Sequence, residues 1–128
     1  MHNILETIVA AKKKEIEPFK AKSPVERFEK DGFFWQIRNR SLVQSLLLPG
    51  STGIIAEFKR KSPSRGWFKK KELEVEPVVV AYNKQAAGIS VLTDSEFFGG
   101  DLDDLIQAKV VTDIPVLRKD FIIDKWQI

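Results

Sequence analysis

The stretch Ile54–Phe68, IIAEFKRKSPSRGWF, begins as an apolar run and ends in a basic, glycine-containing segment. Because successive side chains of a strand alternate between two faces, a strand here places Ile55, Glu57 and Lys59 on one face. Strands of a parallel sheet covered on both faces are normally apolar throughout, so an acid and a base at the carboxyl end are unusual for packing alone. In α/β folds that end holds the chemistry, which makes Glu57 and Lys59 candidate catalytic residues. A structural ion pair that only tolerates burial is the competing interpretation.

The chain after this stretch alternates between helical and strand patterns. A helix is predicted from residue 77 to residue 86, ended by Gly88 and followed by a strand at residues 89–92. Asp101 is a predicted cap for the next helix, which leads to a third strand at residues 114–117. Parallel strands joined by right-handed helical crossovers are expected, and they bring Lys119 to the same rim as Glu57. The pattern therefore predicts the α/β class.

The segment from residue 60 to residue 74 is rich in lysine and arginine and also contains serine, proline and glycine. We expect no regular element here, but a mobile loop that closes over an anionic ligand. Lys59 and Lys119 beside a single Glu57 favour a carboxylate or phosphate as that ligand, because the two ammonium groups repel each other. A glycine-rich nucleotide motif is absent, so a nucleotide cradle is not supported.

The chain before Ile54 has three predicted helices. Asn3 caps the first, which is expected to end before Pro18, and a second begins after Ser23 and ends at Gly32. A third opens at Ser41 and stops at the Pro-Gly pair that follows it. The aromatic residues 33–35 are expected to anchor this helical part onto the rest of the protein.

Composition restricts the function. The 128 residues are 43% hydrophobic and 30% charged, which is typical of a globular protein. A net charge of +3 suits an anionic small-molecule substrate. It is smaller than the excess of basic residues that is typical of nucleic-acid-binding proteins. There is no cysteine, which excludes disulfides and thiol catalysis. Without an apolar run of about 20 residues or a signal-peptide pattern, we expect no membrane partner and a cytoplasmic location.

Three runs in order resemble the indole-3-glycerol phosphate synthase family: EFKRKSPS at Glu57–Ser64, ISVLTDSEFFGG at residues 89–100, and IPVLRKDFI at residues 114–122. The resemblance implies a partial TIM (β/α)8 barrel. Residues 51–128 would supply its first three β/α units, and residues 1–50 would form an N-terminal helical extension that helps cover the active-site mouth. Chains of this family are about twice as long, so the chain resembles the N-terminal half.

The resemblance also implies an activity, the conversion of 1-(o-carboxyphenylamino)-1-deoxyribulose 5-phosphate to indole-3-glycerol phosphate in tryptophan biosynthesis. This is a carboxy-lyase reaction with loss of carbon dioxide and water, and it implies no cofactor and no metal. Lys119 matches the family's general acid. Lys59 matches a lysine that contacts the substrate and assists the later steps. Glu57 matches the carboxylate that orients this lysine and takes part in dehydration. Three further positions match residues that line the substrate pocket: Ser62, Phe98 and Phe121.

The rest of the family's site, namely the strand-five glutamate, the strand-six asparagine and the phosphate-binding loops, would lie beyond Ile128. We therefore expect residues 1–128 alone to be inactive. If Ile128 ends the polypeptide, we expect self-association through an open sheet, and otherwise pairing with the missing C-terminal half. Two alternatives stay open: another phosphate-binding barrel enzyme similar to phosphoribosylanthranilate isomerase, and a non-catalytic half-barrel that serves as a binding or assembly module.

Overall fold

The computed structural model describes residues 3–31, 38–68 and 72–128. The chain forms two compact units, one of residues 39–120 and one in which residues 1–38 associate with residues 121–128. The predicted aromatic anchor, the predicted helix end at Gly32 and three lysines of the basic segment lie outside the described residues. The expected division at residue 50 concerns the complete barrel and stays a prediction.

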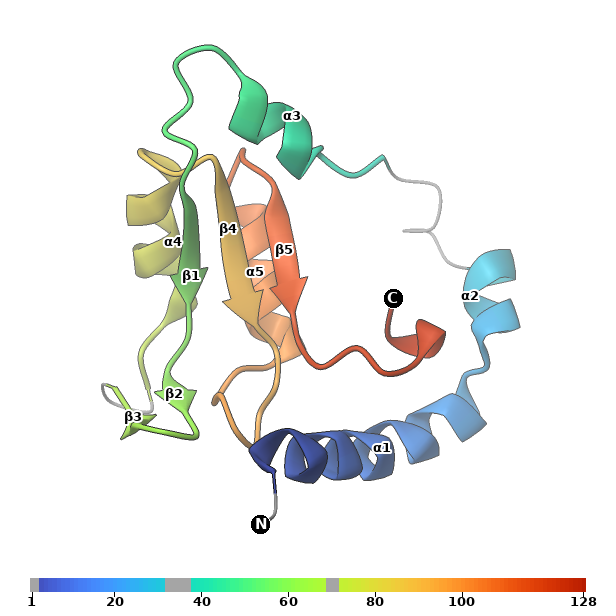
Figure 1. Cartoon of the computed structure of the whole chain (residues 1–128). Helices are drawn as coiled ribbons and strands as arrows, with labels where there is room; N and C mark the ends of the chain where they lie inside the picture. The colour runs from blue at the N-terminus through green and yellow to red at the C-terminus, as the bar shows by residue number, and fades with distance from the viewer. Residues whose placement is uncertain (1–2, 32–37, 69–71) are drawn as a thin grey trace. The chain divides into compact units, whose positions relative to one another are not determined.

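The larger unit is built on a three-stranded parallel sheet in the order β1-β4-β5. The strands are β1 (Ile55–Phe58), β4 (Gly88–Leu92) and β5 (Val116–Lys119). Helices α4 (Val75–Asn83) and α5 (Leu102–Val110) make the two crossovers and cover one face of the sheet (Figure 1). The predicted α/β class with consecutive parallel β/α units is therefore confirmed, and β1 and β5 are the edge strands.

Strand register separates a mainly apolar face from one that carries the charged cluster. Ala56, Ile89 and Val116 are paired neighbours on the helix-covered face, and the next register row on that face is Phe58, Val91 and Arg118. The intervening rows face the other way; they bring Glu57, Ser90 and Lys119 to that face, together with apolar residues such as Leu117. The buried apolar cluster lies between the sheet and the helices and consists of Phe58, Val75, Val79, Ile89, Val91 and Ala108.

Helix starts follow the predicted capping residues. Helix α3 (Leu42–Leu47) begins after Ser41, whose Oγ accepts a hydrogen bond of 3.2 Å from the backbone N–H of Gln44. Asp101 caps α5 in the same way and accepts from the N–H of Asp104 at 2.8 Å. Both caps satisfy backbone donors that a first helical turn leaves without partners.

The α4–β4 junction differs from the prediction. Helix α4 begins at Val75 and ends at Asn83, so the predicted start at residue 77 was two residues late. Gly88 does not end a helix but is the first residue of β4. A Cβ added to Gly88 would lie 2.4 Å from Cδ1 of Leu42, so helix α3 packs in the space that a side chain would take. The glycine gives room for this close approach and does not mark a helix terminus.

Two further predictions in the larger unit were wrong. The third strand is β5 at Val116–Lys119 and not residues 114–117, so Lys119 lies within the strand. The basic segment contains a regular element, the antiparallel hairpin of β2 (Lys61–Ser62) and β3 (Gly66–Trp67). Gly66 has a φ of 65°, a conformation that favours glycine and allows the chain to reverse here.

The smaller unit contains helices α1 (Ile4–Lys22) and α2 (Val25–Asp31) and a 3-10 turn at Lys125–Gln127. The prediction that the first helix ends before Pro18 was wrong, because α1 continues through it. Contacts beyond the proline stabilise the last turn: the ring of Phe19 stacks on that of Trp126 with centroids 6.3 Å apart. Tertiary packing thus outweighs the local preference to break a helix at proline.

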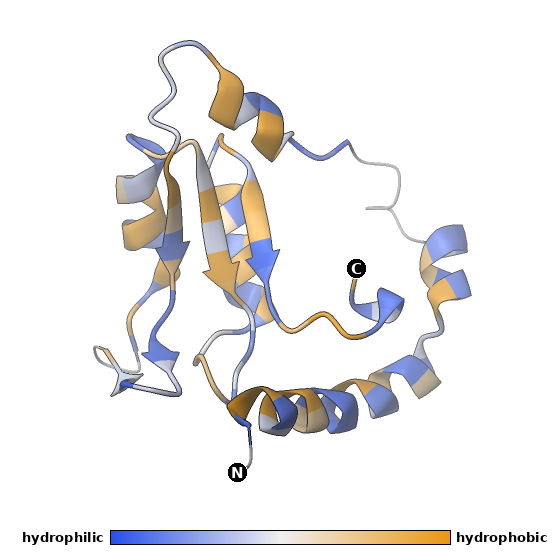
Figure 2. Cartoon of the chain, in the orientation of Figure 1, coloured by the Kyte–Doolittle hydropathy of each residue, from blue (hydrophilic) through white to orange (hydrophobic). Residues whose placement is uncertain are grey.

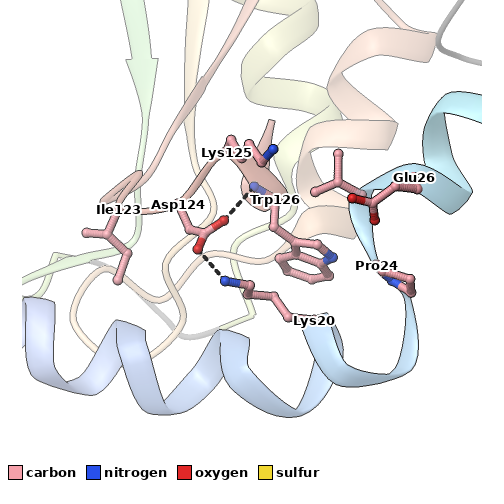
Figure 3. A pocket seen from close by; sticks show the side chains of 8 residues that line it. Lys20, Pro24, Glu26, Ile123, Asp124, Lys125 and Trp126 are labelled. Atoms are coloured by element: carbon pink, nitrogen blue, oxygen red, sulfur yellow. Dashed lines mark hydrogen bonds and ion pairs between the residues drawn. The ribbon is translucent and has the colours of Figure 1, made fainter.

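Trp126 is the centre of the smaller unit's packing (Figure 3). Its indole N–H donates to the carbonyl of Ser23 at 2.7 Å, and its backbone N–H donates to Asp124 at 2.8 Å. Asp124 also pairs with Lys20, and this hydrogen bond is the main cause that holds the pKa of Asp124 below its ordinary value. Asp124 caps the 3-10 turn, and Gln127 completes a capping box.

Candidate active site

Glu57 lies on the face of the sheet that the helices leave uncovered, and two lysines meet it there. Lys119 Nζ is 2.8 Å from Oε2 of Glu57, although 62 residues separate them in the sequence. Lys59 Nζ is 3.3 Å from Oε1. Glu57 is paired in register with β4, and Lys119 is at the end of β5, so parallel pairing across three strands brings the groups together. Figure 2 shows a hydrophilic segment within β1 and a hydrophilic end of β5 on either side of a hydrophobic end of β4.

Burial and the two lysines act in opposite directions on the ionisation of Glu57. Burial is the largest single influence on the pKa of Glu57 and raises it. Hydrogen bonds from Lys119 and Lys59, together with the attraction of their charges, outweigh burial, so the pKa lies below the ordinary value of a glutamate. Glu57 is therefore a carboxylate at neutral pH.

The cluster keeps an excess of positive charge, because one carboxylate does not neutralise two ammonium groups. The side chain of Lys119 is 55% exposed and that of Lys59 is 36% exposed, whereas that of Glu57 is 26% exposed. Both lysine side chains are therefore more exposed than the carboxylate and accessible to an anion that approaches the uncovered face. This arrangement suits a carboxylate or phosphate ligand.

Ser90 is a third donor to Glu57 that the sequence analysis did not identify. Its Oγ donates to Oε2 of Glu57 at 3.2 Å, and the two residues are direct neighbours in the β1–β4 register. Ser90 is only 4% exposed. The signal was present in the sequence, since a single hydroxyl in the apolar run of β4 needs a buried partner.

Arg60 was also missed as a structural residue. Its guanidinium makes a two-pronged pair with Asp104, with Nη2 donating to Oδ1 at 2.8 Å, and it donates to the carbonyls of Leu73 at 2.7 Å and Gly99 at 3.1 Å. The hydrogen bonds to Asp104 are the main cause that raises the pKa of Arg60 above its ordinary value. The side chains are 12% and 6% exposed. Arg60 thus fastens the segment after β1 to the start of α5.

The hairpin and the loop after β4 touch at this same end of the sheet. Lys61 Nζ donates to the carbonyl of Glu96 at 2.7 Å and lies 5.5 Å from the ring centre of Trp67. A Cβ on Gly99 would come within 2.7 Å of the Trp67 ring, so the tryptophan packs closely against that glycine. The two loops therefore form a continuous rim beside the lysine–glutamate cluster.

Two predicted pocket residues belong to this rim. Ser62 is buried in β2, and its Oγ is 3.4 Å from that of Ser64. Phe98 is half-buried, and its backbone N–H donates to Asp94 at 3.3 Å. Phe121 belongs to the smaller unit, where its carbonyl accepts from the side chain of Gln127 at 3.1 Å. The structure thus brings together Glu57, Lys59 and Lys119, and the role of the other three stays a prediction.

The carboxyl end of β5 is fixed by a polar cluster on its other side. Thr93 Oγ1 donates to Oδ2 of Asp120 at 2.8 Å, and Arg118 donates to Thr93 at 3.1 Å and to Asp120 at 3.3 Å. Asp120 follows Lys119 directly, so these bonds hold the backbone from which the lysine projects.

Within residues 3–31, 38–68 and 72–128, no group of three or more acidic or histidine side chains is arranged to hold a metal ion. No helix in these ranges is long and apolar enough to span a bilayer.

Consecutive parallel β/α units with a charged cluster at the carboxyl ends of their strands are the arrangement of part of a (β/α)8 barrel. Comparison with protein families agrees with this class. The model of the indole-3-glycerol phosphate synthase family matches residues 5–128, and the chain belongs to that family.

Individual relatives are similar over the whole chain. The indole-3-glycerol phosphate synthase of Bacteroides thetaiotaomicron is 42% identical over 129 residues, which cover 100% of this chain and 48% of that protein. That of Syntrophobacter fumaroxidans is 42% identical over 131 residues, covering 100% and 49%. That of a Geobacillus species is 40% identical over 129 residues, covering 98% and 45%. The chain spans about half the length of the curated relatives it matches.

Proposed function

We propose that a full-length polypeptide containing this chain is an indole-3-glycerol phosphate synthase of tryptophan biosynthesis. It closes the ring of 1-(o-carboxyphenylamino)-1-deoxyribulose 5-phosphate with loss of carbon dioxide and water. The observation that carries the proposal is the cluster in which Glu57 bridges Lys59 and Lys119 at the carboxyl ends of two strands. Family membership over residues 5–128 supports the same activity.

Lys119 is proposed as the general acid. When the ring carbon attacks the ketone, negative charge develops on the carbonyl oxygen and needs a proton or a positive partner. The exposed ammonium group of Lys119 has protons to donate, and Glu57 orients it through a 2.8 Å hydrogen bond. To donate to substrate, Lys119 has to turn from the carboxylate toward the ligand.

Lys59 and Glu57 are proposed to act in binding and in the later steps. Lys59 is 3.3 Å from Glu57, within reach of a ligand that contacts Lys119. We assign Lys59 to the contact with the substrate's anionic group and to assistance in dehydration, and Glu57 to orienting the lysines and accepting a proton in that step. Three residues are proposed to line the pocket around the substrate: Ser62, Phe98 and Phe121.

Residues 51–128 are proposed to be the first three β/α units of the barrel, and residues 1–50 the extension that helps cover its mouth. In a TIM barrel the phosphate-binding loops usually follow strands seven and eight. Residues 1–128 without the second half are therefore proposed to bind an anion weakly and not to turn it over.

The test is a full-length chimera in which residues 1–128 replace the matching half of the Bacteroides thetaiotaomicron synthase. We expect the chimera to form indole-3-glycerol phosphate and to let a synthase-deficient bacterium grow without tryptophan, and the same chimera with Lys119→Ala to fail in both. A folded chimera that is inactive would contradict the proposal. Turnover of phosphoribosylanthranilate instead would favour the isomerase alternative, and binding without turnover would favour the half-barrel module.

A further inference from the structure

Ser90 differs from its neighbours in β4 in both chemistry and direction. Ile89 and Val91 on either side of it are fully buried in the apolar cluster beneath the helices. Ser90 lies on the opposite face, directly beside Glu57 in the register. A buried hydroxyl without a partner is costly, and here its hydrogen bond goes to Oε2 of Glu57 at 3.2 Å.

The donors to Glu57 differ in rigidity. Lys59 reaches Oε1, while Lys119 and Ser90 share Oε2. Both lysine side chains are long and at least one-third exposed, so holding either in one place has an entropic cost. Ser90 has one side-chain torsion and belongs to the central strand of the sheet. It is the short, fixed donor among these three.

The donors also differ in what happens to them during the proposed reaction. Lys119 has to leave Oε2 in order to donate to the substrate. A hydroxyl carries no net charge and makes no attractive ion pair with an anionic ligand, so Ser90 has no comparable reason to move. Its hydrogen bond would therefore persist on Oε2 when the ammonium group turns away.

We infer that Ser90 is a positioning residue, which holds the carboxylate of Glu57 in place while Lys119 moves between that carboxylate and the substrate. This inference rests on the proposed function for the identity of the substrate. The link between Ser90 and Glu57 rests on their hydrogen bond alone. Without the hydroxyl, the Glu57 side chain is free to follow Lys119, and the ion pair then competes with the transfer of the proton.

A matched pair of variants separates the hydroxyl from the shape of the side chain. Ser90→Thr keeps the donor, and Ser90→Val has nearly the same volume as threonine but no hydroxyl. In the full-length chimera we expect valine to lower kcat by about 10- to 100-fold with a much smaller change in KM, because a misplaced group costs rate more than binding. Threonine is expected to restore most of kcat. Equal kcat values in the two variants would overturn the inference.

A second measurement does not depend on turnover. In residues 1–128 with ¹³C-labelled glutamate, the carboxyl resonance of Glu57 is followed through an acid titration. A hydrogen bond to the charged form lowers a pKa, so Ser90→Ala, which cannot overpack the site, is expected to titrate at higher pH than the wild type. An unchanged titration would overturn the link between Ser90 and Glu57 whatever the protein catalyses. Conversely, a shifted titration in a chain whose chimera shows no synthase activity would support that link and count only against the proposed function.

Discussion

Asp104→Asn is expected to destabilise the larger unit strongly, because it leaves the Arg60 guanidinium without its hydrogen-bonded charged partner. In the wild type the two side chains form a two-pronged pair and are 12% and 6% exposed. Asparagine keeps one acceptor oxygen but turns an amide N–H₂ toward a group that only donates. Arg60 would retain its bonds to the carbonyls of Leu73 and Gly99. The buried positive charge, however, would not be neutralised.

The size of this effect follows from burial. Removing one partner of a buried pair costs roughly 3–5 kcal/mol, and the two remaining carbonyl acceptors favour the lower end, about 3 kcal/mol. With a urea m-value of about 1.5–2 kcal/mol/M, the unfolding midpoint falls by about 1.5–2 M. Asp103→Asn is the matched control, because Asp103 is an exposed acid in the same helical turn.

The assay is urea unfolding followed by the amide resonances of Ile89 and Val91, which report the larger unit alone. We expect the midpoint for Asp104→Asn to lie well below that for Asp103→Asn. Urea midpoints within about 0.3 M of each other would correspond to unfolding free energies that differ by less than about 0.6 kcal/mol. That result would show that the Arg60–Asp104 pair has no stabilising role.

Three further outcomes follow. Lys119→Ala in the full-length chimera should reduce kcat by about 10²–10⁴-fold with little change in substrate affinity. Lys119→Arg should have a similarly low kcat, since guanidinium is a poor proton donor. Near-wild-type turnover in either variant would exclude Lys119 as the acid. In thermal melts Gly100→Ala should lower the melting temperature more than Gly88→Ala. The added Cβ at position 100 would lie 1.9 Å from the backbone oxygen of Leu92, whereas at position 88 the closest atom is the flexible end of the Leu42 side chain. Equal melting temperatures would contradict this. The lowered pKa of Glu57 contributes stability above the ordinary glutamate pKa of about 4.3 that is lost as pH falls through the folded value. The stability difference between wild type and Glu57→Gln should therefore shrink between pH 6 and pH 3, and a constant difference would be evidence against it.

The central part of the site was predictable because it depends on the period of a strand. Alternation predicts Glu57 and Lys59 on one face of a strand; β1 ends at Phe58, one residue before Lys59, but the lysine still reaches Glu57. Parallel pairing of consecutive β/α units brings Lys119 to the same end. Both rules are local or topological, so they need no knowledge of side-chain packing. The ion pairs at 2.8 Å and 3.3 Å confirm that these three groups meet.

The parts that sequence reasoning missed depend on contacts between distant segments. Arg60 in a basic segment suggests a solvated loop, and only the fold shows Asp104 beneath it, 44 residues later. Gly88 suggests a helix end until Leu42 is seen to occupy the space of its side chain. Pro18 suggests a helix break until the packing beyond it is known. In each case a tertiary contact outweighs the local preference.

The three cationic residues that follow Phe58 interact with different partners in different parts of the larger unit. Lys59 pairs with Glu57 on the side of the sheet that the helices leave uncovered, Arg60 pairs with Asp104 on the helix side, and Lys61 donates to the carbonyl of Glu96. A count of charges treats them as interchangeable. Inserting one glycine before Lys59 would leave the net charge unchanged and yet shift every one of these cations by one residue relative to its partner. The spacing of this segment therefore constrains the protein as strictly as its chemistry does.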